Sequence, residues 1–132
     1  MTATSLLFCE QIMTETLSGK STLVGVFSSF SSEEFPVILP HLCVYGQVTS
    51  SGEAATALLT LAHTGQPEKP CYSTNISLPG RDPGSIFEIK QVIRSVRFET
   101  PGLYTLSISL DSCPLCQTTL TVREIPGPHA AQ

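Results

Sequence analysis

The sequence predicts an all-β protein, an antiparallel immunoglobulin-like β-sandwich of about seven to nine strands with little or no helix. Apolar and polar residues alternate from Tyr104 to Leu110, which is the pattern of a strand with one buried face. Pro101 and Gly102 precede that strand, as is typical of the corner where a sandwich strand crosses between sheets. Only 14% of the residues are charged, and Ser and Thr supply much of the polar surface, which suits strands better than helices.

The N-terminal part is predicted to form a β-hairpin followed by an irregular segment. Leu6 to Met13 and Ser21 to Phe30 are rich in apolar and β-branched residues, and Gly19 between them marks a turn. Residues 31–40 contain two prolines, each without a backbone N–H. Val37 to Leu39 is therefore expected to be an edge segment or a crossover.

The remaining elements are predicted from alternation and from turn residues. Ala54 to His63 has helix propensity, but its alternating pattern favours a strand. Thr64 to Gly84 holds several Pro and Gly residues and is predicted to be a long connection with a short strand at Tyr72 to Leu78, the kind of segment that often carries binding function. The other expected strands are His41 to Thr49, Ser85 to Lys90, Val92 to Phe98, Tyr104 to Leu110 and Thr118 to Val122.

The length indicates one domain. A chain of 132 residues has about the usual size of a domain with a single hydrophobic core. We therefore expect a single β-sandwich domain over residues 1–126. Pro126-Gly127-Pro128 interrupts regular structure, so residues 127–132 are predicted to form a flexible C-terminal tail.

Charge and hydropathy exclude several classes of partner. The formal net charge is −4 and the few Lys and Arg residues are scattered, so the basic surface that nucleic acids require is missing. No stretch approaches the apolar length of a membrane helix, and no basic region precedes Leu6-Leu7-Phe8 as it would in a signal peptide. The chain is thus expected to be soluble and cytoplasmic, without a nucleic-acid or membrane partner. Five cysteines, an odd number, favour reduced thiols over a disulfide framework.

Cys113-Pro114-Leu115-Cys116 is a chemical motif with three open interpretations. A pair of cysteines in a hairpin turn resembles a zinc knuckle, although tetrahedral zinc needs two further ligands. A reversible disulfide between Cys113 and Cys116 is the second interpretation. The third, which the sequence favours, is a plain turn that carries two thiols. Further zinc ligands would have to come from dispersed single residues, namely Cys9, Cys43, Cys71, His41, His63 and His129.

The chain is predicted not to be an enzyme. Cys9, Cys43 and Cys71 are expected to serve as small hydrophobic residues of strands, since the sequence shows no Cys–His pairing. The carboxylates have no spacing that would hold two of them at one site as an acid–base pair. No cofactor is expected apart from the zinc alternative. A deep polar pocket with His41 or His63 beside a carboxylate would favour an enzyme instead.

The chain also contains a set of turn and core-strand segments that occur together: Leu6 to Glu10, Gly19-Lys20, Leu23 to Phe27, Phe35-Pro36 with Leu39-Pro40, Leu42 to Val44 and Phe98 to Tyr104. With this set, which spans nearly the whole chain, the sequence resembles a family of small, mostly bacterial proteins of unknown function. The resemblance implies a cytoplasmic sandwich-like β-domain and supplies no catalytic residues. The Cys113–Cys116 segment departs from the family pattern, in which the last hairpin usually turns through polar residues or Gly.

The function that the sequence favours is a non-enzymatic binding or assembly module. Outward Ser and Thr side chains, few charges and a proline-bracketed edge suit a surface that pairs with another chain. The expected interaction surface is a sheet edge or face together with the 64–84 loop, and the expected partner is another protein or a second copy. The alternative is a metal-stabilised or redox-responsive domain that uses Cys113 and Cys116.

Overall fold

The computed structural model of the protein describes residues 2–126, so the predicted tail at 127–132 lies outside the described residues. This part of the chain contains no helix, and so none that could cross a membrane. It forms the strands β1 (Thr2–Thr14), β2 (Ser21–Phe27), β3 (Ser29–Ser32), β4 (Val37–Thr49), β5 (Ala55–His63), β6 (Tyr72–Leu78), β7 (Ile86–Phe98), β8 (Gly102–Leu110) and β9 (Cys113–Glu124).

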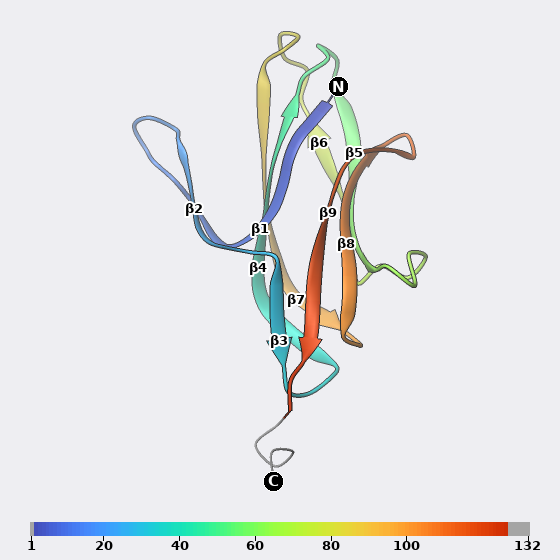
Figure 1. The fold of residues 1–132 in the computed structure, drawn as a ribbon. Helices are drawn as coiled ribbons and strands as arrows, with labels where there is room; N and C mark the ends of the chain where they lie inside the picture. Colours follow the sequence, from blue (N-terminus) through green and yellow to red (C-terminus); the bar gives the residue numbers. More distant parts are fainter. Residues whose placement is uncertain (1, 127–132) are drawn as a thin grey trace.

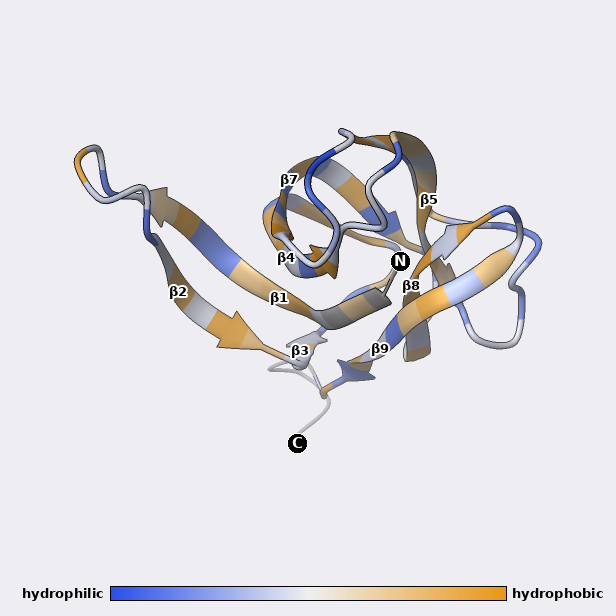
Figure 2. Ribbon diagram, turned by 90° about the horizontal axis from the view of Figure 1, so that it is seen from above, coloured by the Kyte–Doolittle hydropathy of each residue, from blue (hydrophilic) through white to orange (hydrophobic). Residues whose placement is uncertain are grey.

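The strands form two sheets that pack face to face (Figure 1). Sheet A has the strand order β2-β1-β4-β7, and sheet B has the order β3-β9-β8-β5-β6. Figure 2, seen from above, shows the β1–β2 hairpin extending away from the rest of the molecule. The prediction of an all-β sandwich is confirmed, and the strands predicted at Tyr72–Leu78 and at 54–63 are present as β6 and β5.

The core lies between the sheets and is closed by aromatic rings near the predicted corner. Phe98 is fully buried, and its ring centroid lies 5.1 Å from that of Phe30 and 4.9 Å from that of Tyr104. The Tyr104 hydroxyl donates a hydrogen bond of 2.6 Å to the carbonyl of Thr100, which confirms the return to nearby backbone that the Pro-Gly-x-Tyr segment predicts. Other fully buried core residues are Leu42, Leu59, Leu61, Ile93, Leu106, Ile108 and Leu120.

The strand predicted over Ser21–Phe30 is divided at Ser28, where the chain changes sheets. β2 pairs with β1 in sheet A, whereas β3 pairs with β9 in sheet B, and the Ser28 carbonyl accepts a bond of 3.0 Å from the Thr121 N–H. One residue joins β2 to β3, which leaves no length for a reversal of the chain. β3 runs parallel to β9, and this pair is an exception to the antiparallel pairing that the sequence predicts and that the other described strand pairs follow.

Two long strands, β4 and β7, occur where the sequence predicts shorter, separate elements. Val37 to Leu39, expected as an edge segment or crossover, begins β4 and pairs with β7. The β4–β7 ladder skips Pro40, which has no N–H to donate, and β1 pairs with β4 only as far as Cys43. Proline is tolerated here because this stretch has no neighbour on its β1 side. β7 is likewise one strand, with Gln91 paired to Val44 where a break was predicted.

The last hairpin turns at Asp111 and Ser112 and not at the cysteines. Both turn residues have positive φ, 50° and 65°, which is the geometry of a two-residue type I′ turn. Cys113 pairs with Leu110, so the segment Cys113–Cys116 opens β9, and the predicted cysteine turn is wrong. The sequence does not predict this turn, because it lacks the Asn-Gly or Asp-Gly pair that usually marks a type I′ turn.

Ser112→Gly is expected to stabilise the protein by about 1 kcal/mol, because glycine occupies the left-handed region without the steric cost that a Cβ atom brings. Chemical denaturation of both proteins measures the difference. The matched control is Ser73→Gly at an exposed position within β6, where glycine has no such advantage and is expected to cost about 0.5–1 kcal/mol. Equal effects at the two positions would contradict the assigned turn.

Candidate functional site

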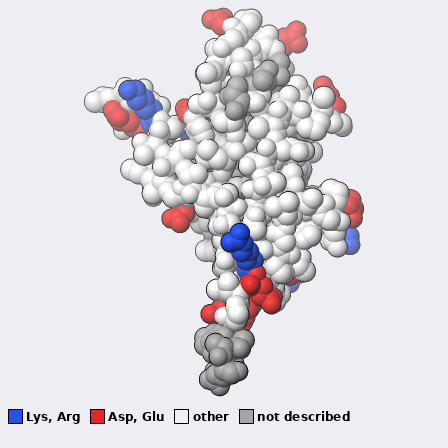
Figure 3. Space-filling model, viewed as in Figure 1, with Lys and Arg blue, Asp and Glu red and all other residues white. Residues whose placement is uncertain are grey.

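The outer face of sheet B is a broad surface of uncharged side chains. Apart from Arg123, near the end of β9, none of the residues that alternate with the core positions in this sheet is charged. In Figure 3 most of the surface in the area of β8 and β9 is white, and a basic and an acidic group lie together at the lower end of β9. The residues of this face are Ser29, Ser31, Thr56, Leu58, Thr60, Ala62, Ser73, Asn75, Ser77, Leu103, Thr105, Ser107, Ser109, Gln117, Thr119 and Thr121.

Cross-strand hydroxyl pairs order the middle of this face. Thr60 and Ser107 lie opposite each other on β5 and β8, with their hydroxyl oxygens 3.0 Å apart, and Thr64 and Thr105 form a second pair at 3.0 Å. A hydroxyl group both donates and accepts, so these side chains retain bonding capacity toward a partner. The face therefore offers neutral hydrogen-bonding groups on a fixed frame.

The 64–84 segment, predicted as a long connection with a short strand, frames this face on one side. Pro67 of this segment lines a hollow of about 270 Å³ together with Thr60, Thr105 and Ser107 of the sheet. Further along, the same segment forms β6, which is an edge strand of sheet B. Loop and edge strand thus border a single uncharged surface.

His63 and Cys71, two of the dispersed candidate ligands, have structural roles near this border. Nδ1 of His63 accepts a bond of 3.0 Å from the Gly65 N–H, and its ring packs edge-on against Tyr104 at 5.0 Å. The Cys71 thiol donates to the Leu61 carbonyl at 3.3 Å, and burial raises its pKa to about 11. At that pKa the thiol stays protonated at neutral pH and is neither a ready nucleophile nor a ready metal ligand.

The β1–β2 hairpin folds back over the outer face of sheet A. β1 pairs with β4 only as far as Cys9 and Cys43, and a straight continuation would carry Thr14 to the level of Ile38. Thr14 instead accepts a bond of 3.0 Å from Nζ of Lys90, which lies beside Tyr45, far from Ile38 along β4. The hairpin therefore bends sharply after Cys9.

Glycine makes this bend feasible. Gly25 lies across from Glu10 on β2 and has a φ of 68°, and a Cβ atom there would come within 2.8 Å of the Glu10 carboxyl carbon. An isolated glycine inside a strand pattern is the local signal of a bend or a close approach. The sequence therefore contains a signal for the bend, but it does not show which surface the bent hairpin covers.

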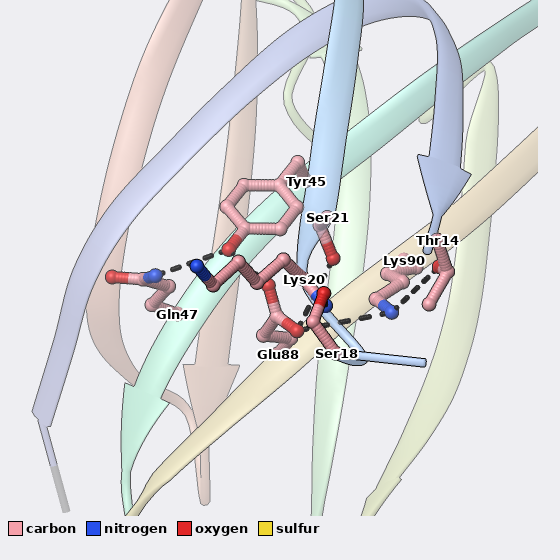
Figure 4. A network of polar contacts seen from close by, with 8 residues as sticks. All are labelled: Thr14, Ser18, Lys20, Ser21, Tyr45, Gln47, Glu88 and Lys90. Carbon is pink, nitrogen blue, oxygen red and sulfur yellow. Dashed lines mark hydrogen bonds and ion pairs between the residues drawn. The ribbon is translucent and has the colours of Figure 1, made fainter. Parts of the chain in front are cut away.

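A polar network fastens the folded hairpin to β4 and β7 (Figure 4). The Tyr45 hydroxyl donates to one carboxylate oxygen of Glu88, and the Ser21 hydroxyl of the hairpin donates to the other at 3.2 Å. Gln47 in turn donates to the Tyr45 oxygen at 3.0 Å, and Lys90 lies 3.8 Å from Glu88. The hydrogen bond from Tyr45 is the main reason that the pKa of Glu88 is lowered from its ordinary value of 4.5.

Cys9 and Cys43 lie beneath this hairpin, directly opposite each other on β1 and β4. Their exposed fractions are 0% and 1% although they face away from the main core. Burial is the main reason that the pKa of each thiol is raised above its ordinary value of 9.0. The hairpin thus keeps both thiols protonated and out of reach of solvent.

Opening of the hairpin is expected to expose these thiols. Tyr45→Phe removes a hydrogen bond worth about 1 kcal/mol, so the open state should be about fivefold more populated and Cys43 should react correspondingly faster with a thiol reagent. Mass spectrometry of the labelled peptides gives the rate at each cysteine. Tyr72→Phe is the matched control, because it removes the bond from Gln91 without touching the hairpin. Equal labelling of Cys43 in both variants would show that the network does not hold the hairpin.

The same network predicts an acid-sensitive hairpin. A lowered pKa means that ionised Glu88 stabilises the folded state at pH values above 4.5, and that this contribution is lost as the pH falls through the lowered folded-state pKa. Hydrogen exchange of the β1–β2 amides, corrected for intrinsic rates, should show weaker protection below pH 4.5 than at neutral pH, and Glu88→Gln should abolish the difference. A pH response that survives in Glu88→Gln would assign it to another group.

A groove of about 410 Å³ opens on the other side of the bend. Phe27, Phe30 and Leu39 give it apolar walls, and Glu10 and His41 lie at its rim. The sequence did not reveal this groove, because its residues come from four strands and meet only through the bend and the change of sheet at Ser28.

The rim does not form a catalytic dyad. Nε2 of His41 lies 2.9 Å from the Glu10 carbonyl and 3.7 Å from the sulfur of Cys43. Because a carbonyl only accepts, Nε2 carries the proton and cannot remove one from the thiol. Nε2 of His41 at the rim of the groove is therefore already engaged in the hydrogen bond to the Glu10 carbonyl.

The predicted zinc or redox segment lies at the start of β9. Cys113 is exposed, whereas Cys116 is partly buried and packs against the core, so the two thiols have different surroundings. Both are free thiols, and no group of three or more metal-ligating side chains occurs among residues 2–126. His129, the remaining candidate ligand, lies outside the described residues. A metal or redox role of Cys113 and Cys116 stays a prediction.

The described strands define a two-sheet β-sandwich whose sheet B carries a loop-bordered, largely uncharged outer face. The model of a family of unknown function, DUF6941, matches residues 4–123, and the chain belongs to this family. The family resemblance predicted from the sequence is thus confirmed, whereas its bacterial distribution stays a prediction.

Comparison with known proteins adds no activity. No curated protein is similar to the chain in sequence. Among solved structures, a β-glucosidase from Listeria innocua, free and in complex with isofagomine, matches 93% of this chain at 12% identity and a TM-score of 0.43. The chain spans 16% of the length of that enzyme. Similarity at this level carries no information about function.

Proposed function

We propose that the protein is a non-enzymatic binding or assembly module that recognises a protein partner through the outer face of sheet B and the adjoining 64–84 segment. The observation that carries this proposal is the absence of charged side chains from the strand positions of that face between Thr56 and Thr121. Charged residues are depleted from the centres of protein interfaces because their desolvation is costly. An uncharged sheet face lowers that cost.

Two exposed leucines are the natural anchors of this surface. Leu58 and Leu103 have exposed fractions of 40% and 43% among neighbours that are mostly hydroxyl-bearing. Apolar anchors surrounded by neutral hydrogen-bonding groups form the usual arrangement of an interface. The hollow beside Pro67 offers a recess for a side chain of the partner.

The related expectations belong to the same proposal. We expect the module to act in the cytoplasm of a bacterium, without nucleic acid, membrane or cofactor, because the chain carries five cysteines, few basic residues and no long apolar stretch. An immunoglobulin-like relationship is supported by the tyrosine corner at Tyr104 and by the chain's change of sheet before β3.

Affinity capture from cells of the source organism tests the proposal. Leu103→Arg is expected to abolish capture of the partner, because it places a charge within the face. Val92→Arg is the matched control, since Val92 is also a strand residue with an exposed fraction of 43% but lies on β7 of sheet A. Capture that is equal for wild type and Leu103→Arg but is lost in Val92→Arg would move the interaction surface to sheet A.

A further inference from the structure

The tip of the β1–β2 hairpin, residues 15–20, presents an unpaired apolar side chain. Leu17 at its apex has an exposed fraction of 96%, and the tip stands clear of the rest of the molecule (Figure 1). The loop is ordered by two backbone hydrogen bonds, from the Glu15 N–H to Lys20 at 2.8 Å and from the Gly19 N–H to Glu15 at 2.9 Å. The tip is thus a fixed projection with a leucine at its end.

The groove at the bend has the complementary character. Phe27, Phe30 and Leu39 form apolar walls around a volume of about 410 Å³, which exceeds the size of one leucine side chain. The Glu10 carboxylate at the rim forms no hydrogen bond or ion pair with any described residue. The groove therefore combines apolar walls with a carboxylate that has no partner among the described residues.

We propose that the groove receives the hairpin tip of a second copy of this chain, with Leu17 of the second copy between Phe27 and Phe30 and its Lys20 facing Glu10. The Lys20 ammonium forms no ion pair with a described residue. Its side chain extends over the network toward Tyr45 (Figure 4), so this contact requires it to turn toward the second copy. This interaction lies on a different surface from the outer face of sheet B and goes beyond the proposed function.

The geometry favours a closed two-fold dimer. Tip and groove lie at opposite ends of the bent half of one hairpin, about 16 Å apart for the five residues from Glu10 to Thr14, so a tip does not reach its own groove. Two hairpins that lie side by side in opposite directions bring each tip to the other groove at once. Such an arrangement repeats the same contact twice and closes the assembly.

Sedimentation equilibrium of the purified full-length chain tests this proposal. Wild type is expected to dimerise with a dissociation constant in the micromolar to millimolar range, because the contact is smaller than a standard interface. Leu17→Ser is expected to weaken the dimer about tenfold, and its near-complete exposure means that the substitution leaves folding intact. A wild-type chain that stays monomeric through the millimolar range would overturn the proposal.

A charge-reversal cycle identifies the contact. Glu10→Lys and Lys20→Glu are each expected to weaken association about tenfold, and the double variant is expected to restore it because the pair is re-formed with the charges exchanged. Lys69→Glu, in the loop beside sheet B, is the matched control and should have no effect. Single variants that associate like wild type, or a double variant that is not restored, would overturn the proposed contact.

One variant separates the tip-in-groove contact from the partner-binding surface on the outer face of sheet B. Leu103→Arg is expected to leave the dimer intact, because Leu103 lies on the outer face of sheet B. A dimer that is lost in Leu103→Arg but persists in Leu17→Ser would overturn the tip-in-groove contact while it supported the outer face as the interaction surface.

Discussion

Phe98→Ala is expected to lower the free energy of unfolding by about 3–5 kcal/mol, which is a large part of the stability of a domain of this size. Phe98 is fully buried at the end of β7, and its ring contacts Phe30 from the strand that changes sheets and Tyr104 from the corner. Truncation would leave a cavity where both sheets, the corner and β3 meet, and the rigid backbone around it could fill that cavity only in part.

Denaturant unfolding monitored by circular dichroism measures this loss. Val26→Ala is the control, since Val26 has an exposed fraction of 58% and its truncation is expected to change the stability by about 0.5 kcal/mol or less. A loss for Phe98→Ala that was as small as that of the control would mean that the two sheets do not pack around this ring.

Gly102→Ala is expected to lower the free energy of unfolding by about 2–3 kcal/mol. Gly102 has a φ of 140°, a region that only glycine adopts readily, and a Cβ atom there would lie 2.5 Å from Nε2 of His63. The imidazole cannot retreat freely, because it is held against Tyr104 and accepts the bond from Gly65. Both the backbone and the contact therefore oppose the added methyl group.

A second glycine separates the two causes. Gly84 also has a positive φ, 86°, but nothing lies within 4 Å of the position that a Cβ atom would take. Gly84→Ala is thus expected to cost only the backbone strain, about 1 kcal/mol. Thermal and chemical denaturation of both variants should show the larger loss at Gly102, and a loss at Gly84 that equalled it would remove the His63 contact from the explanation.

The strands were predictable where one face is buried, because burial imposes a period of two on the sequence. Leu59 and Leu61 of β5 alternate with Thr60, and Leu106 of β8 with Ser107, so core and outer face could be assigned without coordinates. The same pattern predicted outward Ser and Thr side chains on these strands. The structure adds that the face is continuous across the strands of the sheet.

The errors arose where the backbone departs from regular geometry. Nothing in the residues around Ser28 marks a change of sheet. The turn at Asp111 and Ser112 lacks glycine, so the sequence predicts a turn at the cysteines, which in the structure follow the turn. The groove was not predictable, because it depends on the bend at Gly25 and on contacts between residues far apart in the sequence. Periodicity reports local burial, and it carries no information on how a hairpin folds across another sheet.

Binding of a protein partner by the outer face of sheet B is measured by titration calorimetry with the purified protein that affinity capture identifies. We expect Leu103→Arg to weaken binding by about a hundredfold, because an interface anchor is lost, and Val92→Arg to bind like wild type. Equal dissociation constants for wild type and Leu103→Arg, with both proteins folded, would contradict this expectation.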